Sequence, residues 1–214
     1  MDTLECIRKR RSVRRFLDAP IEMEKLGEIM KAAQLAPSAG NLQNWGFIIV
    51  RDPGKRQAVA EACLRQMWIA SAPAVIVVCA AIPKSTKYYG IRGERLYNIQ
   101  NCAAAAQNIL LAATELGLAG CWIGAFEEEM LSSACGIPKE ARPQVVIPVG
   151  YPAEEPRTPP RYPLEKMVFL ESYNGRVSDP LFAAFGMTGH HVQKTIGSAK
   201  DAVKKMHKKL LKEE

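Results

Sequence analysis

The segment from Leu96 to Leu116 constrains the fold more than any other part of the chain. Its apolar side chains recur at the spacing of a helix, at Ile99, Ala103, Ala106, Ile109, Leu110, Ala113 and Leu116. The middle of the segment is apolar on nearly every side, which is typical of a helix buried among other elements. Gly117 and Gly120 follow it and favour its end there. We therefore expect a central buried helix with the rest of the domain built around it.

Shorter segments predict the elements around this helix. Helices are expected over Thr3–Arg11, Pro20–Leu35, Pro53–Ile69 and 127–137. Strands are expected over Trp45–Val50, Pro73–Ala80, Cys121–Phe126, Gln144–Pro152 and Lys166–Leu170. Helices and strands alternate only partly, and the sheet is small. The sequence therefore predicts an α+β layered domain, with a small mixed or antiparallel sheet flanked by helices, rather than a regular doubly wound one.

The charge of the chain is concentrated at its end. The formal net charge is +7, and residues Val192–Glu214 contribute seven lysines against three carboxylates, or +4. The rest of the chain therefore carries about +3, which does not favour a nucleic-acid-binding surface. The longest apolar run, Ala72–Ile82, is too short to span a membrane and is expected to be a buried strand.

The cysteines and the N-terminus bear on the compartment. The six cysteines form no C-x-x-C pair, and several lie in apolar runs, as reduced buried thiols do. Charged residues from Asp2 onward argue against a secretory signal. We expect a cytoplasmic protein.

Three segments are expected along the chain: a main domain over residues 1–177, a linker over 178–191 and a basic amphipathic helix over 192–214. In the last segment, apolar residues recur at spacings of four and three from Val192 to Leu210. Such a helix docks on its own domain, on another subunit, or on an acidic partner or membrane surface. Docking within the protein or between subunits is the favoured interpretation.

Several common catalytic motifs are absent from the sequence. There is no Walker phosphate loop and no G-x-G-x-x-G, and Ser38 stands in "APSAG" rather than in a hydrolase elbow. The histidines are His190, His191 and His207, all in the tail and without carboxylates at metal-ligand spacing, so no metal site is expected. An enzyme without a histidine in its body points to chemistry carried by a bound cofactor.

The stretch "RKRRSVRRF", residues 8–16, is the strongest local signal. A stabilised helix end accounts for one or two arginines, since each exposed charge contributes only about 0.3–1 kcal/mol. A nucleic-acid contact lacks base-reading side chains nearby. If the chain is extended here, Arg10, Ser12 and Arg14 point the same way. Two guanidiniums beside a hydroxyl suit a phosphate group, which is the interpretation we favour.

Four motifs occur in order along the chain: "RRSVRRF", "APSAGNLQNWGFIIV", "AAAAQNILLAATELGLAGCWIGAF" and "VIPVGYP…PPRYPLEKMVF". In this order and spacing they resemble the FMN-dependent nitroreductase family over roughly Leu4–Leu170. The resemblance implies a homodimer with an α+β fold and an FMN in each of two sites at the subunit interface.

The resemblance also implies roles by position. At the ribityl phosphate and the flavin edge it places Arg10, Arg11, Ser12, Arg14 and the late Arg161. On a loop that reaches the flavin from the partner subunit it places Pro37, Ser38 and Asn41. Gln66 matches a side chain at the pyrimidine edge, and Ile123, Gly124 and Ala125 match the turn beside the reactive N5.

The chain departs from the family pattern at two positions. Asn44 stands where the loop commonly has a proline, and Asn101 stands where the central helix commonly begins with an aspartate. The segment Pro83–Leu96 is the candidate substrate lid, in which Tyr88, Tyr89 and Arg92 cover the flavin and bind an anionic acceptor. The plainer interpretation of this segment is a solvated loop with its aromatic rings packed on the domain.

The resemblance implies an FMN oxidoreductase that transfers hydride from NAD(P)H through flavin N5 to a small-molecule acceptor such as a nitroaromatic or a quinone. Two alternatives remain open. One is a specialised flavin chemistry on the same fold, either reductive dehalogenation or flavin fragmentation. The other is an FMN-binding sensor without enzymatic activity, whose basic tail recruits a partner.

Overall fold

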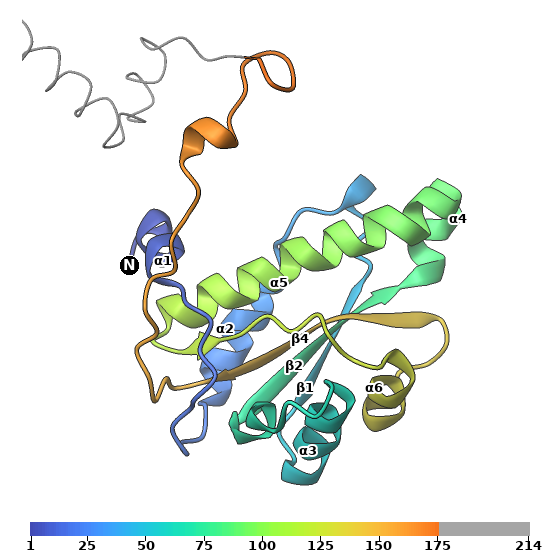
Figure 1. Cartoon of the computed structure of the whole chain (residues 1–214). Coiled ribbons are helices and arrows are strands. Elements are labelled where there is room, and N and C mark those ends of the chain that lie inside the picture. Colours follow the sequence, from blue (N-terminus) through green and yellow to red (C-terminus); the bar gives the residue numbers. More distant parts are fainter. Residues whose placement is uncertain (176–214) are drawn as a thin grey trace, which may run out of the picture. The chain divides into compact units, whose positions relative to one another are not determined.

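The computed structural model describes residues 1–175, and the chain divides into two units, Met1–Thr158 and a second that begins at Pro159. In the first unit a sheet lies between two sets of helices (Figure 1). Its helices are α1 (Thr3–Lys9), α2 (Met23–Gln34), α3 (Pro53–Ala62), α4 (Ile82–Arg92), α5 (Asn98–Glu115) and α6 (Glu128–Cys135). Its strands are β1 (Trp45–Val50), β2 (Ala74–Ala81), β3 (Ala119–Gly120) and β4 (Ala141–Gly150).

The sheet is small and antiparallel throughout, with the strand order β1-β2-β4-β3. The α+β prediction is therefore confirmed. β2 lies in the middle, and its first seven residues are all buried because helices cover both faces of the sheet. This explains why "AVIVVCAA" is a continuous apolar run instead of an alternating one.

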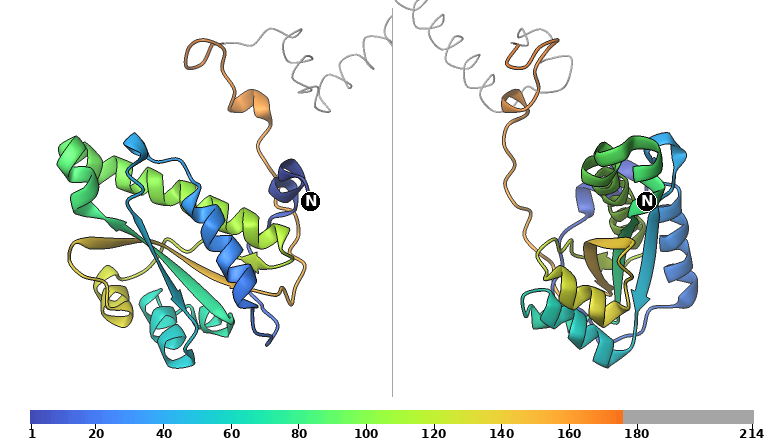
Figure 2. Two further views of the ribbon diagram at one scale, coloured as in Figure 1. Left: turned by 180° about the vertical axis from the view of Figure 1, so that it is seen from behind. Right: turned by 90° about the vertical axis from the view of Figure 1, so that its right-hand side faces the viewer.

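Two apolar clusters fill the space on either side of the sheet. Ile76 and Val78 of β2 pack with α2 and α5, whereas Val75 and Val77 face the side of α3 and α6. Figure 2 shows these helix pairs on opposite faces of the sheet. Alternate side chains of one strand thus contribute to both layers.

The central helix is confirmed as α5. It begins at Asn98, slightly later than the predicted Leu96, because a short π-helical turn over Gly93–Tyr97 precedes it. Its buried face is built largely from small side chains, namely Cys102, Ala105, Ala106 and Ala113. The small side chains allow α2 and the sheet to pack closely against it.

A helix predicted as continuous over Pro53–Ile69 is broken in the structure. α3 ends at Ala62, Leu64 and Arg65 have left-handed backbone angles (φ 55° and 56°), and a 3-10 helix follows over Met67–Ser71. No glycine or proline marks the break, so apolar spacing alone extended the helix through it. The prediction was wrong because Leu64 and Arg65 adopt left-handed backbone angles, which residues other than glycine seldom adopt and which only the surrounding structure maintains.

Two predicted strands differ from the structure. Between Cys121 and Phe126 only Ile123 pairs, through one bridge to Val146, and the true strand β3 precedes this segment. The strand predicted over Lys166–Leu170 was wrong, because Leu164–Lys166 is a 3-10 helix and Leu170 bonds within its own loop to Gly175. The linker and the helix predicted over 178–214, with the three histidines, lie outside the described residues.

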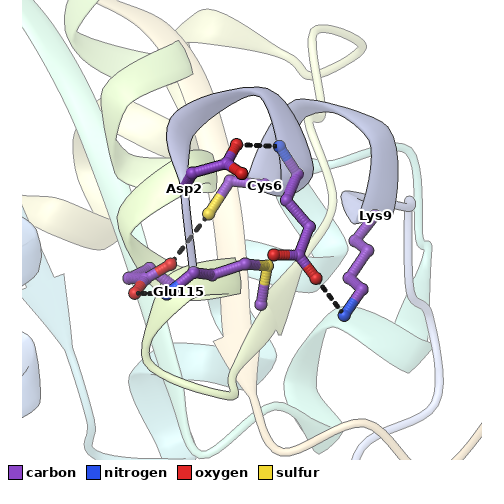
Figure 3. A network of polar contacts seen from close by, with 6 residues as sticks. Asp2, Cys6, Lys9 and Glu115 are labelled. Atoms are coloured by element: carbon purple, nitrogen blue, oxygen red, sulfur yellow. Dashed lines mark hydrogen bonds and ion pairs between the residues drawn. The ribbon is translucent and has the colours of Figure 1, made fainter.

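Helix α1 is fixed to the far end of α5 (Figure 3). The Asp2 carboxylate accepts a hydrogen bond from the Glu5 N–H at 2.8 Å and caps the helix. The Glu115 carboxylate accepts hydrogen bonds from the Cys6 thiol at 2.9 Å and from the N-terminal ammonium at 2.6 Å. These donors lower the pKa of Glu115. This contact sets where the basic stretch begins.

Among the described residues, no helix is long and apolar enough to cross a membrane.

Candidate functional site

The basic stretch runs along the edge of the sheet. After α1 ends at Lys9 the chain extends, Ser12 bridges to Gly120, and the Val13 N–H donates to the Gly120 carbonyl at 3.2 Å. The Val13 side chain is buried in the domain at 3% exposure. The basic side chains on either side of Ser12 are thereby placed next to β3.

Arg10, Ser12 and Arg14 lie near one buried thiol. Burial raises the pKa of Cys121, while Arg14, the Ser12 hydroxyl and Arg10 act in the opposite direction. Within residues 1–175, neither Arg10 nor Arg14 forms an ion pair with a carboxylate. Their guanidinium groups are therefore free to bind an anion, which is the property that a phosphate site requires.

The Arg14 guanidinium lies over an aromatic ring. Its guanidinium carbon lies 5.9 Å from the centre of the Trp68 ring, within the range of a cation–π contact. Trp68 belongs to the 3-10 helix that follows the left-handed pair Leu64–Arg65. Sequence reasoning missed Trp68, because the helix predicted through this region gave no reason to single it out. Gln66, two residues earlier, donates to the Cys63 carbonyl at 3.0 Å.

Arg11 has a different environment from its neighbours. Its guanidinium donates to the Arg8 carbonyl at 2.6 Å, to the Arg10 carbonyl at 2.8 Å and to the Thr158 hydroxyl at 2.7 Å. It thus satisfies carbonyls at the end of α1 and ties them to the last residue of the first unit. These donors are engaged with protein groups in this structure.

A carboxylate that sequence reasoning did not identify fixes the backbone of Arg14. Glu154 accepts hydrogen bonds from the N–H groups of Arg14 at 2.7 Å and of Arg15 at 3.1 Å. It also lines an open groove of about 310 Å³ together with Glu155 and the basic residues Arg8, Lys9, Arg10 and Arg11. The only sequence signal was a pair of acidic residues in a proline-rich loop.

The turn Ile123–Ala125 offers backbone donors. The Ile123 N–H is engaged with the Val146 carbonyl at 2.9 Å. Gly124 and Ala125 are exposed, and within the described part of the chain their N–H groups donate to no protein group. Two adjacent unpaired N–H groups suit a ligand that accepts hydrogen bonds at a ring nitrogen or oxygen.

The loop Pro37–Gln43 lies at the other end of α5. Gly40, Asn41 and Gln43 all have left-handed backbone angles, with φ of 55°, 52° and 47°. The Ser38 hydroxyl accepts from the Gln43 N–H at 3.0 Å, and the Ala39 N–H donates to Asn101 at 3.0 Å. Pro37 and Asn41 are exposed.

The candidate lid is helical, not a loop. α4 runs to Arg92 with a break at Gly90, and the π-helical turn follows. The Tyr89 ring packs edge-on against Tyr97, with ring centres 5.0 Å apart, and Arg92 donates to the Tyr97 hydroxyl at 2.9 Å. Tyr88 is 63% exposed. Of the three predicted lid residues, Tyr88 presents its ring most freely to solvent, whereas the other two contact the domain.

Two groups of the predicted site residues lie at opposite ends of α5, whose course is seen in Figure 1. Ser12 pairs with Gly120, just after this helix, whereas Ala39 bonds to Asn101 in its first turn. At 1.5 Å per residue, Asn101 and Glu115 are about 21 Å apart along the axis. One copy of the chain therefore does not bring both groups to one small ligand. Arg161 belongs to the second unit, where it is exposed.

Comparison with known proteins gives one consistent family. The model described as "Nitroreductase family" matches residues 7–82 and 64–151. A protein of Archaeoglobus fulgidus, whose name pairs NADH dehydrogenase with NAD(P)H nitroreductase, is 42% identical over 72% of this chain and 87% of its own. A protein of Thermus thermophilus named NADH dehydrogenase is 32% identical over 78% of this chain and 95% of its own.

Solved structures agree with this result. The NADPH:FMN oxidoreductase of Vibrio harveyi, solved with NAD⁺, superposes with a TM-score of 0.74 at 25% identity, covering 92% of this chain and 91% of its own. An FMN-dependent nitroreductase of Clostridium difficile superposes with a TM-score of 0.69 at 29% identity, covering 79% of this chain and 99% of its own.

The Glu154 contact leads to a testable prediction. Substitution Glu154→Ala removes the acceptor of two backbone N–H groups, so we expect the free energy of unfolding to fall by about 1–3 kcal/mol. Glu155→Ala is the matched control, since this neighbour lines the same groove and should change stability by less than about 0.5 kcal/mol. Urea denaturation measures both, and amide hydrogen exchange should accelerate at Arg14 and Arg15 in the first variant. Equal stability of the two variants would contradict the assignment.

Proposed function

Since the chain belongs to the nitroreductase family, we propose that it is an FMN-dependent oxidoreductase that passes hydride from NAD(P)H to a nitroaromatic, quinone or similar small-molecule acceptor. The observation that carries this proposal is the pair of guanidiniums beside Ser12, neither of them bound to a carboxylate within residues 1–175. Relatives named as FMN reductases in Bacillus subtilis and as an NADPH-flavin oxidoreductase in Vibrio harveyi support it.

The residues around β3 fit the two ends of FMN. Arg10, Ser12 and Arg14 supply cationic and hydroxyl donors suited to the phosphate and the flavin edge. The unengaged N–H groups of Gly124 and Ala125 suit the polar edge of the ring. Bound there, FMN would supply the redox chemistry, namely hydride transfer between the nicotinamide donor and the acceptor.

Each protein group has a positioning or electrostatic role in this proposal. Arg14 lies over Trp68 and is anchored through its backbone by Glu154, so its charge is held in place before the ligand arrives. A preorganised cation stabilises negative charge on a reduced ring more than a flexible one does. Residues 1–175 contain no histidine, so no imidazole acts as acid or base in this part of the chain.

We propose that the working unit is a homodimer. The basic group and the loop Pro37–Gln43 lie about 21 Å apart along α5, and two copies packed with opposite directions of α5 bring the loop of one to the basic group of the other. Such two-fold pairing generates two equal sites. The lid helix α4 contacts the loop, because a Cβ at Gly40 would collide with the Tyr89 hydroxyl, and so it accompanies the loop to the partner's site.

The first test is an absorption spectrum of the purified protein with added FMN, followed without oxygen as NADH and then NADPH are added. We expect flavin bands that bleach rapidly with at least one donor and recover with a quinone or nitroaromatic. Bound flavin that stays oxidised with both donors would favour a sensor or a specialised flavin chemistry. A protein that takes up no FMN would refute the proposal.

A second prediction concerns Arg14. Loss of one charge-assisted contact in Arg14→Ala should weaken FMN binding about tenfold or more and lower the flavin potential. Arg15→Ala is the matched control, since it removes an exposed arginine of the same stretch and should leave both quantities unchanged. Fluorescence titration gives the affinity and a dye-coupled reduction gives the potential. An unchanged flavin content and potential in Arg14→Ala would exclude this role.

A third prediction tests the shared site. Arg14→Ala and Asn41→Ala damage opposite halves of it, so each homodimer should bind FMN poorly. Co-expression of the two variants gives mixed dimers in which one site combines both undamaged halves, and about a quarter of all sites should recover. No recovery would mean that both residues serve the same copy's cofactor.

A further inference from the structure

The buried polar side chains of the described residues form one connected chain. They are Asn44, Ser85, Asn98 and Asn101, each at most 4% exposed. They come from the end of the loop Pro37–Gln43, from α4 and from the first turns of α5. Buried polar groups destabilise a domain unless they are hydrogen-bonded. The arrangement of the hydrogen bonds among these four side chains therefore needs a structural reason.

Asn101 stands at the centre of this chain. Its Oδ1 accepts the Ala39 N–H at 3.0 Å, and its Nδ2 donates to Asn44 Oδ1 at 2.6 Å. Asn44 Nδ2 donates in turn to Asn98 Oδ1 at 2.5 Å, and the Ser85 hydroxyl donates to the same oxygen at 2.6 Å. Because donor and acceptor alternate along the chain, only one orientation of the Asn44 and Asn101 amides satisfies it.

Asn44 and Asn101 are bonded to each other. A proline at position 44 would offer Asn101 no partner, and an aspartate at position 101 would have no donor for Asn44. Asn44 and Asn101 therefore form a matched, uncharged pair.

The loop that this pair holds is strained. Asn41 and Gln43, neither of them glycine, have left-handed backbone angles, which persist only where the surroundings enforce them. The Ala39–Asn101 bond is the contact that ties the start of this strained segment to the rigid helix α5. Without it, the loop samples other conformations, and a ligand must bear the free energy of ordering it.

We propose that Asn101 is a positioning residue for the loop Pro37–Gln43, with Asn44 as the partner that orients its amide. This inference rests on the proposed function, in that the ligand whose binding reports the loop geometry is FMN. Ser85 extends the same chain of hydrogen bonds to α4. The loop and the lid helix are therefore both fixed to the first turn of α5.

The test compares Asn101→Leu with a matched control. Asn108→Leu removes the same kind of side chain from the same helix, about two turns along from Asn101, where Asn108 Nδ2 donates to the Ala32 carbonyl of α2 at 2.9 Å. Both variants should lower the melting temperature. Only Asn101→Leu should weaken FMN binding, by about tenfold or more, since it leaves the Ala39 N–H without its acceptor. Asn101→Asp keeps the acceptor for the Ala39 N–H but loses the donor to Asn44, so its FMN affinity should lie between those of Asn101→Leu and the wild type.

A double variant separates positioning from stability. In Asn44→Leu/Asn101→Leu both members of the pair become apolar, so the melting temperature should recover relative to the sum of the single changes. The FMN affinity should stay low, because the Ala39 anchor is still absent. Stability then recovers while affinity does not, which a purely structural role does not produce.

Three outcomes overturn the inference. If the wild-type protein binds no FMN, the proposed function fails and this inference fails with it. If the wild type binds FMN and Asn101→Leu binds it as tightly as Asn108→Leu, the positioning role alone is refuted. If the double variant regains affinity along with stability, Asn101 acts only through folding.

Discussion

The packing of α5 against β2 and β4 is the constraint on which the rest of the structure depends. Ala105, Ala106 and Ala113 are fully buried, and their small side chains let the helix lie close to the sheet. Burying apolar surface there, at about 25 cal/mol per Å², supplies the stabilisation of that layer. α1, β3, α4 and the loop Pro37–Gln43 are all attached to one end or the other of this helix, so its length sets the distance between them.

That distance shapes the candidate site. The cationic residues attach where α5 gives way to β3, and the loop attaches where α5 begins. A helix is stiff over this length, so the two groups stay apart within one copy. The proposal of a shared site between two copies follows from this rigidity together with the chemistry of the two groups.

The polar contacts differ between the two ends of α5. At the β3 end, Arg10 and Arg14 form no ion pair with any carboxylate of residues 1–175, as a site for an anionic ligand needs. At the loop end, amides are buried and fully paired without any net charge, which avoids the large desolvation cost of a buried carboxylate. Glu154 and Trp68 belong to the first arrangement, since one fixes the backbone of Arg14 and the other its guanidinium.

The sequence by itself determined the central helix, the strand Trp45–Val50 and the layered α+β class, and it predicted the segments of the candidate site. Apolar spacing and the order of four motifs carry that information locally. Only the tertiary structure decided the break at Leu64–Arg65, the contact of Trp68 with Arg14, the role of Glu154 and the bond between Asn44 and Asn101. Each of these depends on a partner distant in sequence or on strained backbone that packing enforces, and neither leaves a periodic signal along the chain.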